Sequence, residues 1–320
     1  MNILVTGGAG YVGSHTVRWL LRKGHHVVVL DDLSTGHMVA LPKNVFFFRG
    51  SITDTVLVQT ICKQHAIEAC VHFAAKSLVG ESVQNPRKYW TDNVVATHML
   101  VGALLDVGVT RLVFSSTAAV YGEPETPYIV EAHPKRPLNP YGRTKLAIEE
   151  MLNDYTAHGL RSIALRYFNA AGAEPEDGLG ERHDPETHLI PLAIGATLGA
   201  RPPLTIYGDD YPTPDGTCIR DYVHVTDLAD AHARALEALQ GPGQHKAYNL
   251  GSGRGYSVRE VLDEIQQVSG ITVPHTFGAR RNGDPSILVA DATKAQTELG
   301  WRPERNLAVI IQQAWQHHKA

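Results

Sequence analysis

The hydrophobic positions in the first half of the chain form short runs that are separated by amphipathic stretches. The apolar runs predict strands at Asn2–Val5, His26–Leu30, Asn44–Arg49, Ala69–Phe73, Arg111–Ser115 and Ser162–Arg166. The amphipathic stretches predict helices at Tyr11–Lys23, Thr53–Gln64, Trp90–Val107 and Pro140–His158. Because the strands are apolar throughout, both faces of their sheet must be covered. Strands and helices that alternate through right-handed crossovers predict an α/β fold with a doubly wound, Rossmann-type parallel sheet.

The pattern changes after about residue 170. Gly, Pro, Asp and Glu become frequent at 171–185 and 208–216, which predicts a smaller, loop-rich lobe. Arg220–Leu239 and Lys246–Leu250 resemble elements of the sheet domain again. We therefore expect residues 1–170 to form a dinucleotide-binding domain, to which elements around 220–250 return. Residues 171–320 would form mainly a second, interleaved lobe for the substrate.

Composition and charge narrow the classes of function. The 320 residues suffice for a sizeable core, and the formal net charge of −4 gives no basic footprint for nucleic acid. No apolar run approaches the length of a membrane span. Cys62, Cys70 and Cys218 lack metal-ligand spacing, and the 17 histidines are scattered. We expect reduced thiols, a cytoplasmic protein and no metal site.

Three glycines, Gly7, Gly10 and Gly13, lie where the first predicted strand turns into a helix. The first permits a tight turn, the second lets backbone N–H groups approach a pyrophosphate, and the third allows close helix–strand packing. Asp31 ends the second strand, roughly 20 residues on, where a carboxylate bonds a ribose 2′-OH. Because that carboxylate would repel a 2′-phosphate, the segment predicts binding of NAD rather than NADP.

Tyr141 and Lys145 lie four residues apart on one face of a predicted helix, with Asn139 as its N-cap and Pro140 at its start. Lowering a tyrosine pKa from about 10 to about 7 requires roughly 4 kcal/mol. The Lys145 ammonium, at about 4 Å and an effective dielectric near 20, would supply about that much stabilisation of the phenolate. Thr117, after the fifth strand, places a hydroxyl at the sheet edge where ligands bind. Together with the glycine loop, these side chains predict an enzyme that moves hydride at a carbinol carbon.

Several ordered motifs together resemble the extended short-chain dehydrogenases/reductases and, within them, the UDP-glucose 4-epimerase family. The resemblance covers nearly the whole chain. The matching segments are 7–16, 72–76 with 79–82, 114–122, 139–145, 165–172, 207–216 and 220–225.

The resemblance implies a two-step reaction on UDP-glucose and UDP-galactose. Tyr141 would remove the proton of the sugar 4-OH while hydride leaves C4 for tightly bound NAD. The ketose would turn over within the site and receive the hydride on its other face. The family also implies a homodimer, in which the helices Trp90–Val107 and Pro140–His158 pair with their copies.

The resemblance further implies a set of contacts. Those to NAD would fall on Gly7, Tyr11, Val12, Asp31, Phe73, Lys76, Asn93, Tyr141, Lys145 and Tyr167. Those to the UDP-sugar would fall on Thr117, Tyr141, Asn169, His188, Tyr207, Arg220, Arg281, Asp284 and Leu288. Arginines suit bidentate binding of a diphosphate, and an asparagine both donates and accepts hydrogen bonds.

Four positions depart from the usual family pattern. Thr117 replaces a serine but keeps the hydroxyl, and His188 replaces a frequent asparagine. Ser51 stands in place of an aspartate that would meet the adenine amino group, a contact for which Asp54 is a candidate substitute. Leu288 is intermediate between the large and small residues that the family uses against and for N-acetylated sugars, which favours UDP-glucose and UDP-galactose.

Three alternatives remain at this point. A nucleotide-sugar 4,6-dehydratase needs an acid and a base after the threonine, where this chain has Ala118 and Ala119. A 4-epimerase of another UDP-sugar (an N-acetylhexosamine, a pentose or a uronic acid) would share the reacting centre. A non-catalytic NAD-binding module would share the fold, because fold does not fix function.

Overall fold

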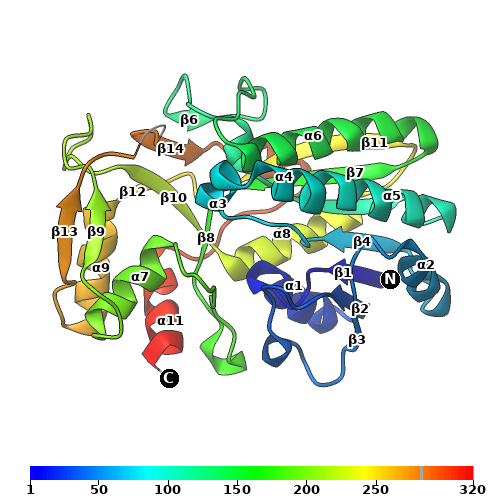
Figure 1. Cartoon of the computed structure of the whole chain (residues 1–320), viewed down its shortest axis with the longest axis horizontal. Coiled ribbons are helices and arrows are strands. Elements are labelled where there is room, and N and C mark those ends of the chain that lie inside the picture. The colour runs from blue at the N-terminus through cyan, green and yellow to red at the C-terminus, as the bar shows by residue number, and fades with distance from the viewer. Residues whose placement is uncertain (282–283, 320) are drawn as a thin grey trace.

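Two lobes lie side by side in the computed structural model, which describes residues 1–281 and 284–319 (Figure 1). The larger lobe is built on a seven-stranded sheet. The smaller lobe, on the left of the view, holds a five-stranded sheet and a pair of strands. In the part of the chain that the structure describes, no helix combines the length and apolar character needed to cross a membrane.

The seven-stranded sheet is parallel throughout, with the strand order β11-β7-β5-β4-β1-β2-β3. The direction of winding reverses at β1, so β1 and β4 flank the crevice in which ligands of such sheets bind. The predicted Rossmann-type sheet is confirmed. Its strands are β1 (Asn2–Thr6), β2 (His26–Asp31), β3 (Phe46–Arg49), β4 (Ala69–His72), β5 (Arg111–Thr117), β7 (Arg161–Tyr167) and β11 (Gln244–Leu250).

Helices cover both faces of this sheet. Since successive strand residues point to opposite sides, each strand contributes side chains to two cores. Ile3 and Val5 of β1 join a core formed with α1 (Tyr11–Arg22) and α8 (Val225–Ala238). Leu4, between them, joins the core on the other face. Three helices supply that second core: α2 (Thr55–Gln64), α5 (Ala96–Asp106) and α6 (Pro140–Asp154).

The helix predicted at Trp90–Val107 begins earlier and is not uniform. Asn85 caps its start through the backbone N–H of Lys88, and α4 (Pro86–Tyr89) follows at once. A π-helical turn at Trp90–Val95 then joins α4 to α5. This wider turn holds Asn93, whose side chain is completely buried beneath the sheet edge.

The second lobe draws its strands from distant parts of the chain. Its sheet has the order β12-β10-β14-β6, with β8 paired to β10, while β13 pairs with β9. β6 precedes the predicted boundary near residue 170. β10 stays in this second sheet, whereas β11 pairs with β7 in the first. The strands are β6 (Tyr128–Ile129), β8 (Asn169–Ala171), β9 (Leu204–Tyr207), β10 (Ile219–His224), β12 (Gly255–Ser257), β13 (His275–Gly278) and β14 (Ile287–Ala290).

Helices complete the second lobe and its edges. A separate apolar core unites the sheet with α7 (Leu189–Thr197), α9 (Val258–Ser269) and α11 (Leu307–Lys319). The short helices α3 (Val79–Gln84) and α10 (Thr293–Glu298) lie against the first lobe.

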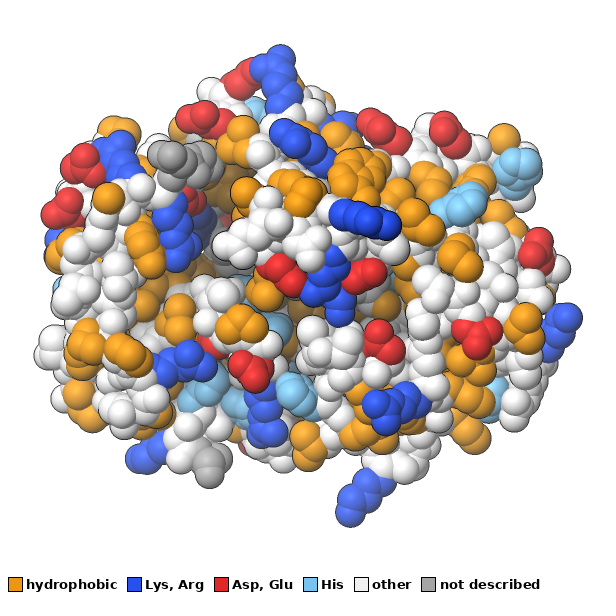
Figure 2. Space-filling view, viewed as in Figure 1, with side chains coloured by type: hydrophobic (Ala, Val, Ile, Leu, Met, Phe, Trp, Pro, Cys, Tyr) orange, Lys and Arg blue, Asp and Glu red, His pale blue; other side chains and the backbone are white. Residues whose placement is uncertain are grey.

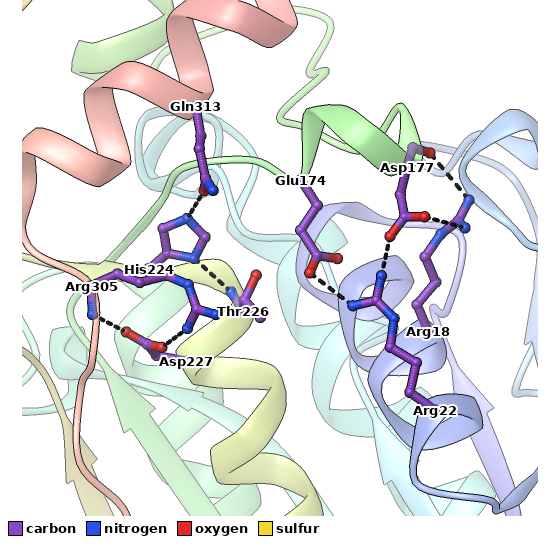
Figure 3. A network of polar contacts seen from close by, with 9 residues as sticks. All are labelled: Arg18, Arg22, Glu174, Asp177, His224, Thr226, Asp227, Arg305 and Gln313. Atoms are coloured by element: carbon purple, nitrogen blue, oxygen red, sulfur yellow. Dashed lines mark hydrogen bonds and ion pairs between the residues drawn. The ribbon is translucent and has the colours of Figure 1, made fainter.

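Buried polar contacts join the two lobes. The Asp221 carboxylate of β10 accepts hydrogen bonds from the backbone and hydroxyl of Ser252, both at 2.7 Å, and from Gly253 and Ala290 at 3.0 and 3.1 Å. Nearby, His224 bonds Gln313 of α11, at 2.6 Å (Figure 3). The carboxylate therefore ties the loop after β11 to the strands of the second sheet.

A second set of contacts holds the loop after β8 on α1. Arg22 pairs with Glu174 at 3.0 Å and with Asp177, and Arg18 reaches the Asp177 carboxylate at 3.5 Å (Figure 3). The loop thereby lies against the helix that follows the glycine turn.

Candidate active site

The glycine loop leaves the N-terminus of α1 without a side-chain cap. A Cβ on Gly13 would lie 2.2 Å from the carbonyl oxygen of Gly7, so the fold itself requires that glycine. A Cβ on Gly10 would meet nothing closer than the same oxygen at 3.4 Å. Gly10 instead borders a hollow whose other lining residues include Tyr11, Ser14 and Arg182. Uncapped N–H groups beside an open hollow suit an anionic group.

The two glycines predict different failures. Gly13→Ala should lower the melting temperature strongly, because backbone must move to admit the methyl group. Gly10→Ala should leave the melting temperature within a few degrees of wild type but reduce the cofactor that survives gel filtration, by about tenfold or more. Thermal unfolding and cofactor absorbance measure the two effects. Equal loss of stability in both variants would contradict the assignment of Gly10 to the cradle.

Asp31 lies at the end of β2, beside the glycine loop, as predicted. Its carboxylate accepts hydrogen bonds from the backbone N–H groups of Ala9, at 2.9 Å, and Leu33, at 2.8 Å. Burial raises the pKa of Asp31 and these hydrogen bonds oppose the rise. Each oxygen keeps a further lone pair for a ribose hydroxyl. Asp54 caps α2 by accepting from the backbone N–H of Leu57 at 2.9 Å, and its contact with an adenine stays a prediction.

The predicted cofactor residues after β4 lie at the same edge of the sheet. The Phe73 ring packs 4.7 Å from that of His232. Lys76 donates to the Ser34 hydroxyl at 2.8 Å, across the crevice from β4 to the loop after β2. The Asn93 amide is bonded to the Lys76 backbone and to the Thr144 hydroxyl. Asn93 therefore fixes the position of Lys76, and its own contact with a cofactor stays a prediction.

Tyr141, Lys145 and Thr117 meet at the carboxyl end of β5. Asn139 caps α6 through Gly142 at 2.9 Å, with Pro140 in the first turn, as the sequence predicts. The Lys145 ammonium is buried, donates to the Ser115 carbonyl at 2.8 Å and lies 5.9 Å from the centre of the Tyr141 ring. The Thr117 hydroxyl accepts from the backbone N–H of Ala119 at 3.1 Å and lies close enough to the Tyr141 phenol to lower its pKa.

The net effect of the chain's own groups is to raise the pKa of Tyr141, whereas the sequence led us to expect a lowered pKa. Burial raises that pKa to about 12, although the nearby Thr117 hydroxyl lowers it. Burial also lowers the pKa of Lys145 to about 7, although Glu149 raises it. The spacing places both residues on one helical face, but the ammonium bonds the Ser115 carbonyl instead of approaching the phenol. Further positive charge at the site is therefore needed to favour the phenolate.

Glu149, one turn beyond Lys145, belongs to a buried ion pair that the sequence did not reveal. It accepts from Arg166 Nε at 2.9 Å and from the Ser116 hydroxyl at 2.5 Å. Arg166 also donates to the Tyr121 hydroxyl at 2.8 Å. The pair neutralises itself behind the site and fixes α6 against β5 and β7. Tyr167, on β7, bonds the Ser115 hydroxyl and so lies next to the carbonyl that holds Lys145.

Five of the predicted substrate residues come together in the second lobe. Arg220 and Leu288 are register partners on β10 and β14. Arg220 forms an ion pair with Asp284, and the Arg281 guanidinium lies 3.9 Å from the centre of the Tyr207 ring. The face shown in Figure 2 is hollowed between the lobes, with basic side chains at its margin.

The remaining predicted substrate residues lie elsewhere around the cleft. Asn169, on β8, donates to the Asp221 carbonyl at 2.9 Å. His188 bonds Glu186 at 2.8 Å and lies 2.9 Å from Glu181. Burial lowers the pKa of His188, but these carboxylates outweigh burial and raise it to about 10. The Nδ1 of His188 therefore contacts Glu181 and Glu186 within the protein. The sequence did not predict these contacts.

The chain is similar to known proteins over its whole length. Residues 3–251 match the NAD dependent epimerase/dehydratase family. The UDP-glucose 4-epimerase of Halalkalibacterium halodurans is 52% identical over all of this chain and 96% of its own. The chain belongs to the NAD dependent epimerase/dehydratase family.

Solved structures agree closely in shape. The UDP-glucose 4-epimerase of Brucella ovis, in complex with NAD, is 49% identical, with a TM-score of 0.96 over 99% of this chain and 98% of that one. The Bifidobacterium longum enzyme, in complex with NAD⁺ and UDP, is 36% identical, with a TM-score of 0.94 over 100% and 98%. The whole chain thus has the fold of these members of the epimerase/dehydratase family.

The residues present fit the cofactor of this family. The uncapped start of α1 and the space beside Gly10 would accommodate a pyrophosphate. Asp31 offers carboxylate oxygens at the end of β2, which fits a ribose and opposes a 2′-phosphate. The members of an epimerase/dehydratase family differ in the groups beside the tyrosine. Here Ala118 and Ala119 follow Thr117, and methyl groups transfer no protons.

Proposed function

We propose that this chain interconverts UDP-glucose and UDP-galactose by NAD-dependent 4-epimerisation. The observation that carries the proposal is that Tyr141 and the buried Lys145 lie together on α6, with Thr117 near the phenol, and that two alanines follow Thr117 where a dehydratase requires an acid and a base. This centre can move one proton and has no second group for the loss of water.

Tyr141 acts as the base that takes the proton from the sugar O4 and as the acid that returns it. Thr117 shares a hydrogen bond with that hydroxyl and orients it toward the phenol. Lys145, held by the Ser115 carbonyl, supplies positive charge beneath the ring. When bound, NAD accepts a hydride from C4 and gives it back, and its oxidised ring adds the positive charge that favours the Tyr141 phenolate.

Residues of the second lobe hold the UDP part of the substrate. Arg220 and Arg281 present planar guanidinium groups that suit a diphosphate, and Asn169 offers donor and acceptor to sugar or phosphate. Binding would exchange the Arg220–Asp284 ion pair for contacts with the ligand, which frees the Asp284 carboxylate for ribose hydroxyls. Tyr207, on β9, lies beside Arg281 and faces the uracil.

Leu288 sets the room beside the reacting sugar. Its side chain packs against the buried cluster of Ala118, Val120 and Tyr121, in the turn that follows Thr117. Leu288→Ser should raise the ratio of kcat/KM for UDP-N-acetylglucosamine to that for UDP-glucose by about tenfold, because it removes apolar bulk. Ile287→Ser is the control, since neighbouring strand residues point to opposite faces. An unchanged ratio would argue against selection by Leu288.

The first experiment is incubation of the purified protein with UDP-galactose and no added NAD. Appearance of UDP-glucose is the expected result, and it requires a cofactor retained through purification. A chain that turns over UDP-xylose or UDP-glucuronate but not UDP-galactose would favour a pentose or uronic acid 4-epimerase. A chain that holds NAD and turns over none of these would favour a binding module.

We further propose that the enzyme works as a homodimer in the cytoplasm. Val83, Trp90 and Val95 expose 62%, 42% and 50% of their surfaces near α5 and α6, where Figure 2 shows hydrophobic side chains gathered. Such a patch suits an interface between copies. The three cysteines are free thiols, which suits a reducing compartment. Light scattering that gives the mass of one chain would contradict the dimer.

A further inference from the structure

Four side chains of the loop after β8 face one another in an arrangement that the proposed proton transfer does not require. They are Glu181, His183, Glu186 and His188, referred to below as the His/Glu cluster. One nitrogen or oxygen from each residue lies within 4.8 Å of those of the others. Both imidazoles present Nδ1 to the carboxylates.

Four nitrogen–oxygen distances within the His/Glu cluster lie near the edge length of a coordination tetrahedron, and the two at Glu186 are to different oxygens of its carboxylate. Ligands that lie 2.0–2.1 Å from a tetrahedral ion are separated from one another by about 3.3 Å. His183 Nδ1 lies 3.2 Å from Glu181 and 3.6 Å from Glu186. His188 Nδ1 lies 2.9 and 2.8 Å from the same two carboxylates. An ion bound among these four residues would require only small changes in the nitrogen–oxygen distances.

Burial and hydrogen bonding hold the side chains of the cluster in place. Glu181 and Glu186 expose 5% and 9% of their surfaces, so two carboxylates lie side by side away from water. His183 Nδ1 is buried without a hydrogen bond of acceptable geometry in the described part of the chain. The backbone N–H groups of Thr187 and His188 donate to Glu186 at 2.7 and 2.8 Å and fix its carboxylate. Such outer hydrogen bonds orient ligands at metal sites.

We infer that the His/Glu cluster binds a divalent transition metal of the zinc type. Two imidazole nitrogens with two carboxylate oxygens form a tetrahedral donor set that suits Zn²⁺, whereas Mg²⁺ and Ca²⁺ prefer oxygen ligands throughout. This inference reverses the expectation of no metal, which rested on cysteine spacing and on scattered histidines. The Nδ1 of His188 becomes a metal ligand, and its Nε2 is left for any contact with the substrate.

The site has a structural role in the loop that covers the cofactor cradle. The His183 ring lies 6.1 Å from the ring of Tyr11, the first residue of α1, and meets it edge-on. Upstream, Glu174 and Asp177 hold the same loop on α1 through Arg18 and Arg22 (Figure 3). An ion in the His/Glu cluster would hold this loop at a second point, beside Tyr11, in addition to the ion pairs of Arg18 and Arg22.

Metal content measures this inference without recourse to activity. The full-length protein is stripped with a chelator, loaded with zinc chloride and passed through gel filtration before elemental analysis. We expect wild type to retain about one equivalent of zinc and to melt at a higher temperature than the stripped protein. His183→Gln and His188→Gln should each lower zinc affinity at least about tenfold. Magnesium chloride should neither remain bound nor raise the melting temperature.

His158→Gln is the matched control, because His158 is exposed in the turn that follows α6, outside the cluster. It should retain zinc as wild type does. Zinc that washes out of the wild type, or that remains equally bound in both cluster variants, would overturn the inference. Glu181→Gln keeps the shape of the side chain and serves as a third variant if a histidine substitution fails to fold. It should also lose zinc.

Discussion

Tyr141→Phe is expected to lower kcat by about 10²- to 10⁴-fold while the protein keeps its cofactor. The substitution removes the oxygen that exchanges a proton with the sugar O4 and leaves the ring that packs 6.5 Å from that of Tyr89. The Thr117 hydroxyl keeps its contact with the backbone N–H of Ala119, so the fold should be little disturbed. Turnover of UDP-galactose and the absorbance of released cofactor measure the two effects.

Tyr155→Phe is the control for this substitution. Its hydroxyl bonds only the His98 ring among the described residues, at the surface end of α6. It should keep wild-type turnover, because the same atom is removed away from the site. A Tyr141→Phe protein with turnover within threefold of the control would refute the assignment of the base.

Asp221→Ala should lower the free energy of unfolding by about 3–5 kcal/mol, which corresponds to roughly 10 °C in melting temperature. Four donors converge on this buried carboxylate, and three of them are backbone N–H groups that cannot turn away to water. The loss should exceed that of an ordinary surface ion pair, because buried donors stay unpaired. Chemical denaturation gives the free energy directly.

Asp210→Ala provides the comparison for that prediction. The side chain of Asp210 is 71% exposed and pairs with Arg280, an arrangement that contributes about 0–1 kcal/mol. A loss at Asp221 no larger than the loss at Asp210 would show that the lobes are held together by their apolar contacts alone.

The sequence predicted the first lobe well because its signals are local. Continuous apolar runs mark strands buried on both faces, and the Asn139–Pro140 pair marks the start of α6. The same pair at Asn85–Pro86 marks the start of α4, but the apolar spacing that predicted this helix begins only at Trp90. The π-helical turn that carries Asn93 has no comparable sequence mark, because it depends on what the widened turn packs against.

The site contacts that the sequence did not predict are formed between segments that are distant along the chain. A spacing of four placed Tyr141 and Lys145 on one helical face, yet it could not show that the ammonium bonds the Ser115 carbonyl. Similarly, the residues of the His/Glu cluster follow one another at intervals of two, three and two in a loop. Such spacing has no helical or strand period, so their convergence depends on the fold of the loop against α1.

The position of β11 has a consequence for how the chain emerges from the ribosome. Its seven residues pair with β7 along the whole length of both strands, but residues 168–243 must be made first. At about 5–20 residues per second, the outer edge of β7 waits roughly 4–15 seconds before the synthesis of its partner begins. An unpaired edge is a template for pairing with other chains. The speed of translation across the second lobe therefore influences how much protein is lost to aggregation before the sheet closes.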